Sequence, residues 1–189
     1  LLLIGFLSLS FSLKANLFLY TIVLPLLCLY NSYLKSIPIF GNIIIAFLLA
    51  SIFIFTELCL LNSFTILYFP TLLIFSLSFL RELLKDIQDY QGDITSNINT
   101  LPVLLGQKRT INIAIILIII YAIMILLPYF FKYFNYIYLY SIIILIEIPL
   151  FIMVFLLLNK PTNRSFKYIA YLTKGMSLAG LLIILILYI

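Results

Sequence analysis

Four carboxylates stand at regular intervals within the polar stretch 81–109, which is surrounded by apolar sequence. On a helix with about 100° per residue, all four fall within an arc of about 60°. Like charges at this spacing repel one another, and a membrane interface weakens their screening. Their clustering therefore predicts a cationic ligand. Mg²⁺ is the natural candidate, because one or two carboxylates hold it while a substrate phosphate completes its shell. The four residues are Glu82, Asp86, Asp89 and Asp93.

The composition indicates an integral membrane protein. The 189 residues are 66% hydrophobic and 9% charged, whereas a soluble domain is about 25% charged. The basic residues lie between apolar runs, so we interpret the net charge of +5 as a topology signal and not as a nucleic-acid-binding surface. Cys28 and Cys59 lie inside apolar runs and are expected to be packing residues. The chain contains no His, which excludes imidazole metal ligands and His general bases.

Seven apolar runs predict an all-α, polytopic transmembrane helical bundle that forms a single domain over residues 1–189. A span needs about 20 residues, and the runs are too continuously apolar for barrel strands. The first run is short, and the chain begins inside it without a Met, so we expect that the N-terminal part of a longer protein precedes residue 1. The runs are Leu1–Leu13, Asn16–Leu34, Gly41–Leu61, Phe64–Phe79, Thr110–Phe131, Tyr136–Leu158 and Tyr168–Ile189.

The distribution of basic residues predicts the orientation in a plasma or inner membrane. If successive spans cross the membrane in opposite directions, Lys14 and Lys132 lie on one side of the membrane and eight other cations lie on the opposite side. The positive-inside rule then makes 81–109 a cytoplasmic Asp-rich loop. Within it, Gly92 lets the backbone turn or approach a ligand, and residues 101–105 are predicted to form a short helix over the site. The eight cations are Lys35, Arg81, Lys85, Lys108, Arg109, Lys160, Arg164 and Lys167.

Other polar and aromatic residues in the spans admit two interpretations. Glu57 and Glu147 lie mid-span, where ionisable groups are costly and usually functional. Each stands alone, so acceptor binding and a packing role both remain open, and Glu147 precedes Pro149, where a local kink is expected. Lys174 is expected to extend its amine toward the membrane surface. An aromatic belt at one membrane edge is predicted at Tyr133, Tyr136, Tyr138 and Tyr140.

The segment RELLKDIQDYQGDITSNINTLPVLLG resembles the second aspartate-rich motif of the UbiA superfamily of intramembrane prenyltransferases. The upstream segment YNSYLKSIPIFGN is similar to the family's Tyr- and Lys-bearing segment, which ends in Gly-Asn. The opening of the motif is most similar to the geranylgeranylglycerol-phosphate geranylgeranyltransferase branch. The matching positions are Arg81-Glu82, Lys85-Asp86, Asp89, Gly92-Asp93, Thr100-Leu101-Pro102 and Gly106.

The resemblance implies Mg²⁺-assisted transfer of a prenyl group from a prenyl diphosphate to a lipophilic acceptor within the lipid bilayer. It implies no nucleic acid and no protein partner. The family's Tyr-x-x-x-Lys spacing is not reproduced, because Tyr30 and Tyr33 stand at other distances from Lys35. The metal ligands implied are Asp86, Asp89 and Asp93, which with Lys35 form the catalytic set. The residues implied to contact the diphosphate are Lys35, Arg81, Lys85, Tyr30 and Asn42.

The chain departs from the family pattern in one respect. Family members carry about nine spanning helices and a first aspartate motif, Asn-Asp-x-x-Asp, after the second helix; this chain contains no such motif. We expect the first two helices and that motif to precede residue 1. Two alternatives are an inactive truncated paralogue and a cation-coupled transporter. A transporter would place its ion site near the midplane and show internal repeats, which this sequence does not show.

Overall fold

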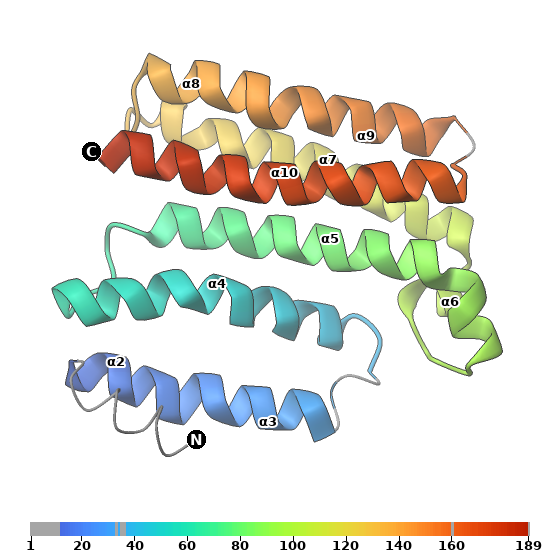
Figure 1. Ribbon diagram of the computed structural model, residues 1–189, viewed down its shortest axis with the longest axis horizontal. Helices are drawn as coiled ribbons and strands as arrows, with labels where there is room; N and C mark the ends of the chain where they lie inside the picture. The colour runs from blue at the N-terminus through green and yellow to red at the C-terminus, as the bar shows by residue number, and fades with distance from the viewer. Residues whose placement is uncertain (1–11, 33, 35–36, 160, 189) are drawn as a thin grey trace. The chain divides into compact units, whose positions relative to one another are not determined.

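The computed structural model describes residues 12–32, 34, 37–159 and 161–188, with side chains up to residue 185. Every regular element in these ranges is a helix, which confirms the predicted all-α bundle (Figure 1). The chain divides into two compact units, Leu1–Phe75 and Ser76–Ile189. The division falls inside the long helix α5 (Tyr68–Thr95).

Unit 1 consists of two long helices followed by the start of α5. The first long helix is continuous through α2, η1 and α3, and it packs against α4. Two small side chains of α4, Ala46 and Ala50, are buried, with exposed fractions of 0% and 1%. The Ser12 hydroxyl also donates to the Leu58 carbonyl over 2.7 Å, which ties the start of one helix to the end of the other. The bounds are α2 Leu13–Phe18, η1 Leu19–Val23, α3 Leu24–Ser32 and α4 Phe40–Leu61.

Glu57 holds the connection between α4 and α5 together. Its carboxylate is buried and accepts backbone N–H groups from Thr65 (2.6 Å), Ile66 (2.8 Å) and Leu67 (2.7 Å). These N–H groups lie just before the first turn of α5, where no helical carbonyl is available to accept them. The bonds therefore support the packing interpretation of Glu57.

Unit 2 contains the rest of α5 and three long helices, of which the middle one packs against both others. The helix α7 contacts α8 and α9, and α10 contacts α8, η3 and α9. The short helix α6 lies where the chain turns from α5 into α7 (Figure 1). The bounds are α6 Leu101–Leu105, α7 Gln107–Phe130, α8 Tyr136–Ile142, η3 Ile143–Glu147, α9 Ile148–Leu158 and α10 Asn163–Tyr188.

Two prolines inside long helices are each preceded by a π-helical turn. Pro25 follows η1 by two residues, and Pro149 follows η3 by two residues. Proline lacks an N–H and its ring clashes with the carbonyl four residues back, so a wider turn relieves both problems. The Leu24 and Ile148 N–H groups accordingly donate to carbonyls five residues earlier. The kink expected near Pro149 is thus a π-helical turn in an otherwise continuous helix.

Five helices in the described ranges are long and apolar enough to cross a membrane, and they match five of the predicted runs. The predicted run 1–13 lies outside the described residues, apart from Ser12 and Leu13. The predicted span 64–79 is not among the five, since α5 begins only at Tyr68 and meets its first charge at Arg81. The five are Leu13–Ser32, Phe40–Leu61, Gln107–Phe130, Tyr136–Leu158 and Asn163–Leu185.

One boundary differs from the sequence pattern, and one local prediction is wrong. The last helix begins at Asn163, five residues before the predicted apolar run, because Thr162 and Ser165 cap it reciprocally: each backbone N–H donates to the other side chain. Tyr138 does not belong to the exposed aromatic belt. It is 4% exposed, and its hydroxyl donates to the Ile125 carbonyl over 2.6 Å, whereas its three neighbours in the predicted belt are exposed.

Candidate functional site

The second half of α5 has an apolar face and an acidic face on opposite sides of the helix. Leu80, Leu83 and Ile87 are buried, with exposed fractions of 1% or less. They lie on average about 120° around the helix from the centre of the acidic stripe. Burial of this apolar face fixes the rotation of α5, so the stripe points away from the buried side chains of the helix. The segment first expected to be a loop is therefore helical to Thr95, as the stripe requires.

The end of α5 is closed by backbone and side-chain bonds next to the last acidic residue. Asn97 adopts a left-handed conformation with φ of 53°. The N–H groups of Asn97 and Ile98 donate to the carbonyls of Ile94 and Asp93, which is a Schellman motif. The Thr100 hydroxyl then donates to Asp93 Oδ2 over 2.9 Å. Asp93 is thereby held at a defined position where α5 ends.

The predicted short helix at residues 101–105 is present as α6. Leu101 and Pro102 are buried, whereas Leu104 and Leu105 are exposed. Gly106 joins α6 to α7 with φ of +85°, a conformation that favours glycine. Gly92, by contrast, is helical within α5. A turn at Gly92 is therefore wrong, and its close approach to a ligand stays a prediction.

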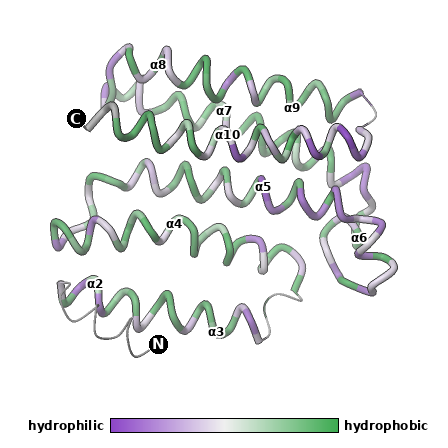
Figure 2. The backbone as a smooth tube through the Cα atoms, in the orientation of Figure 1, coloured by the Kyte–Doolittle hydropathy of each residue, from purple (hydrophilic) through white to green (hydrophobic). Residues whose placement is uncertain are grey.

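The structure distributes the predicted site residues between the two units. Asp89 is exposed on α5, and Asp86 and Asp93 are half-buried on the same face of unit 2. Tyr30 and Asn42 belong to unit 1, where they lie near the end of α3 and the start of α4. Lys35 lies outside the described residues. Figure 2 shows that hydrophilic residues gather over the second half of α5, around α6 and at the start of α10.

Arg81 and Lys85 do not lie on the acidic stripe. They face α10 across a cavity of about 190 Å³. Around α5, Lys85 lies about 70° and Arg81 about 110° from the centre of the stripe. Lys174 also lines this cavity, whereas its position in an apolar run predicted only an amine that extends toward the membrane surface. The α10 residues that line the cavity recur every three or four positions, which places them on one helical face. This spacing could have been read from the sequence. The full lining is Arg81, Leu84, Lys85, Gln88, Phe166, Ile169, Ala170, Thr173 and Lys174.

The acidic stripe suits Mg²⁺ in its donor chemistry. Carboxylate oxygens are the ligands that this ion prefers, and one or two are usual when substrate phosphate and water supply the others. Among the described residues no group of three or more acidic or sulfur side chains could hold a metal ion. The stripe therefore fits a magnesium ion that is shared with a phosphate-bearing substrate, and not one enclosed by protein ligands.

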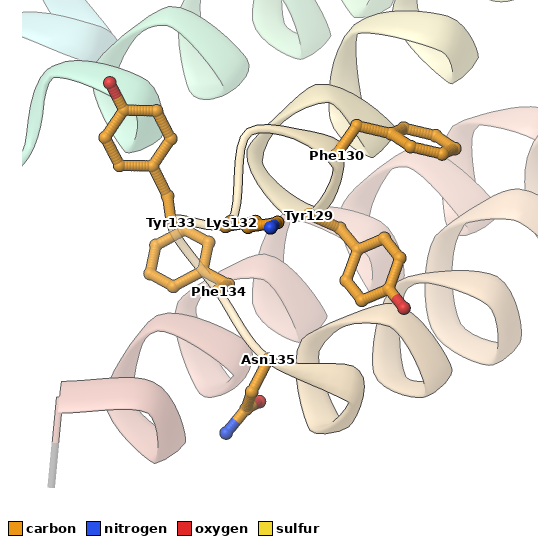
Figure 3. Close-up of a pocket in the computed structure, with 6 residues that line it drawn as sticks. All are labelled: Tyr129, Phe130, Lys132, Tyr133, Phe134 and Asn135. Carbon is orange, nitrogen blue, oxygen red and sulfur yellow. The ribbon is translucent and has the colours of Figure 1, made fainter.

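A second cavity, of about 540 Å³, lies at the connection between α7 and α8. Figure 3 shows that its side chains splay outward and do not converge on a common point. Its aromatic rings and single amine are typical of side chains at a membrane–water interface. No carboxylate is among its lining residues. It therefore offers no group of the kind that the acidic stripe provides. The lining is Tyr129, Phe130, Lys132, Tyr133, Phe134 and Asn135.

Comparisons with known proteins agree with the helical architecture. The family described as the UbiA prenyltransferase family matches residues 1–186. A digeranylgeranylglyceryl phosphate synthase of Methanobrevibacter smithii is 37% identical over 162 residues, which cover 82% of this chain and 55% of that protein. The protein of the same name from Methanococcus maripaludis is 33% identical over 139 residues, covering 73% and 49%.

A solved structure shows the same fold. It comes from work on digeranylgeranylglyceryl phosphate synthase in membranes, and it matches with a TM-score of 0.76 and 29% identity. The match covers 94% of this chain and 62% of that one. This chain thus spans about half the length of the curated relatives it matches.

Proposed function

Because this chain belongs to the UbiA prenyltransferase family, we propose that its acidic stripe forms one side of a site for prenyl transfer in the membrane. The observation that carries the proposal is the arrangement of Asp86, Asp89 and Asp93 on one face of α5, opposite its buried face. A carboxylate face at the end of an apolar helix suits a substrate that has a charged head and an oily tail.

The proposed substrates are a prenyl diphosphate and a lipophilic acceptor that carries a hydroxyl group. In the transfer, the bond between the prenyl carbon and the diphosphate oxygen breaks, and the diphosphate leaves with the bonding electrons. The acceptor oxygen bonds to the prenyl carbon and loses its proton, which gives an ether. Apolar helices around the prenyl chain would exclude water, which would otherwise compete with the acceptor.

The acidic residues would act by holding magnesium. One or two of Asp86, Asp89 and Asp93 would provide its carboxylate ligands. When bound, magnesium stabilises the negative charge that develops on the leaving diphosphate. We propose Lys35, Tyr30 and Asn42 as further diphosphate contacts, on the basis of the family resemblance alone. Thr100 would keep Asp93 in place through the hydrogen bond from its hydroxyl.

The names of the relatives support a narrower proposal about the acceptor. Since several are digeranylgeranylglyceryl phosphate synthases, we propose that the transferred group is geranylgeranyl and that the acceptor is a prenylated glyceryl phosphate. The product would be a lipid that carries two ether-linked chains. The acceptor would then bring a phosphate of its own, in addition to the diphosphate of the donor.

Substitution of Asp89 by Asn tests the proposed metal site. Asp89→Asn and Asp93→Asn keep the side-chain shape but remove the charge, so we expect at least about a hundredfold loss of kcat, of the size seen when one charge-stabilising group is removed. Transfer of radiolabelled geranylgeranyl to a glyceryl phosphate lipid, with magnesium present, measures it. The control is Lys132→Gln, which lies at the connection between α7 and α8.

The outcomes separate the alternatives. Unchanged turnover in both Asp variants would overturn the metal assignment. No transfer by the unsubstituted full chain, with any prenyl diphosphate, would favour the inactive paralogue.

A further inference from the structure

The cavity between α5 and α10 combines positive charge with an apolar floor. Leu84, Phe166 and Ile169 are buried beneath it, with exposed fractions of 4% or less. Arg81 and Lys85 come from successive turns of α5, and Lys174 comes from α10. No carboxylate is among the lining residues, and no ion pair in the described part of the chain involves these three cations.

Lys174 stands far from the start of its helix. It lies eleven positions after Asn163, which is about 16 Å along α10. A lone ammonium at such a depth in a spanning helix is costly unless it faces a polar cavity and meets a partner. Its Nζ is 6.0 Å from the centre of the Tyr171 ring, a weak contact at the limit of the cation–π range. Lys174 is otherwise exposed, so its amine is free to meet an anionic group in the cavity.

The size of the cavity limits what that ligand can be. A volume of about 190 Å³ is below the 300–1,000 Å³ typical of sites that enclose a whole small molecule. It is equivalent to about six water molecules in the liquid, which suits a phosphate with its glycerol carbon and not a prenyl chain. Gln88 and Thr173 add neutral polar groups to the lining.

We propose that this cavity binds the phosphate headgroup of a glycerol lipid through Arg81, Lys85 and Lys174. The inference rests on the proposed function, because a glyceryl phosphate acceptor would supply such a headgroup. It assigns Arg81 and Lys85 to this phosphate and not to the diphosphate, because both line this cavity together with Lys174, whereas none of the carboxylates does. The acceptor and the anionic lipids of the bilayer share this chemistry.

A binding experiment without magnesium or prenyl diphosphate tests the site separately from catalysis. The full chain is placed in nanodiscs of phosphatidylcholine containing increasing phosphatidic acid, and the retained lipid is measured by native mass spectrometry. Loss of one charged contact to phosphate is expected to weaken apparent affinity about tenfold in Lys174→Gln. Lys174→Arg should retain the lipid, and so should the control Lys167→Gln, which removes one charge from α10 outside this cavity.

Equal binding of phosphatidic acid by Lys174→Gln and the unsubstituted chain would overturn the proposal. So would an equal loss in Lys167→Gln, since that would show a general effect of charge. Asp89→Asn should bind phosphatidic acid normally, so a failure of the metal assignment remains distinguishable from a failure of this site.

A transfer assay distinguishes the two sources of the headgroup. If the acceptor occupies the cavity, Lys174→Gln should raise the KM for the phosphorylated acceptor about tenfold and change kcat less than twofold. If a bilayer lipid occupies it, the KM for the acceptor should not change, and phosphatidylglycerol should bind as well as phosphatidic acid.

Discussion

Glu57 and Glu147 are both carboxyl groups in the middle of long apolar helices, yet their surroundings differ. Glu57 accepts three successive backbone N–H groups from the turn that precedes α5. In Glu147, the buried Oε1 has no hydrogen-bond partner in the described part of the chain. The sequence could not show which of the two carboxyl groups has hydrogen-bond partners. The partners of Glu57 are backbone groups of the α4–α5 connection, and their position depends on the path of that connection in the folded chain.

We predict that Glu57→Gln destabilises the protein by about 2 kcal/mol, because charge-assisted bonds are lost and an amide NH₂ would face backbone donors. Thermal unfolding of the detergent-solubilised protein measures the effect. Thr56→Val is the matched control, since the exposed Thr56 hydroxyl bonds only within its own helix. A normal unfolding temperature combined with altered acceptor use would instead indicate that Glu57 binds the acceptor.

At the scale of the element, α5 shows which features could be predicted. The 100° periodicity of Glu82, Asp86, Asp89 and Asp93 indicated one helical face, and that prediction is confirmed by α5. The length of α5 was not predicted, because hydropathy alone cannot show that a helix continues when its sequence turns polar. The Schellman closure at Asn97 sets its end.

The junction between α6 and α7 depends on one residue, Gly106. We predict that Gly106→Ala destabilises the protein by about 1 kcal/mol, because an L-residue with Cβ is strained at φ of +85°. Gly92→Ala is the matched control: its Cβ would meet no atom within 4 Å, and alanine favours the helix by about 1 kcal/mol. Chemical unfolding in detergent compares the two, and equal effects would contradict the role of backbone conformation.

At the scale of the whole molecule, five predicted spans and the family were confirmed. The membrane spans could be predicted because apolar runs and helix length follow from the bilayer itself. The proximity of Lys174 to Arg81 and Lys85 could not be predicted from the sequence, because it depends on how α10 packs against α5. The transporter alternative finds no support, because the matching family consists of transferases. The cytoplasmic position of the acidic segment stays a prediction.

Cysteine labelling in intact cells measures the orientation. In a background of Cys28→Ser and Cys59→Ser, we expect Ser96→Cys and Asn163→Cys to be protected from a membrane-impermeant maleimide. Lys132→Cys, at the other end of α7, should be labelled from outside. All three positions are exposed in the structure, so accessibility within the fold does not limit the reaction. Labelling of Ser96→Cys from outside would reverse the predicted topology.

The two π-helical turns have a consequence for comparing homologous sequences. A π-helical turn holds one residue more than an α-helical turn. The helices that contain Pro25 and Pro149 therefore each have one additional residue in the turn before the proline. Loss of that residue alone would rotate the remainder of the helix by about 100° relative to its neighbours. In aligned relatives, we therefore expect a one-residue gap at η1 or η3 to occur together with replacement of the following proline.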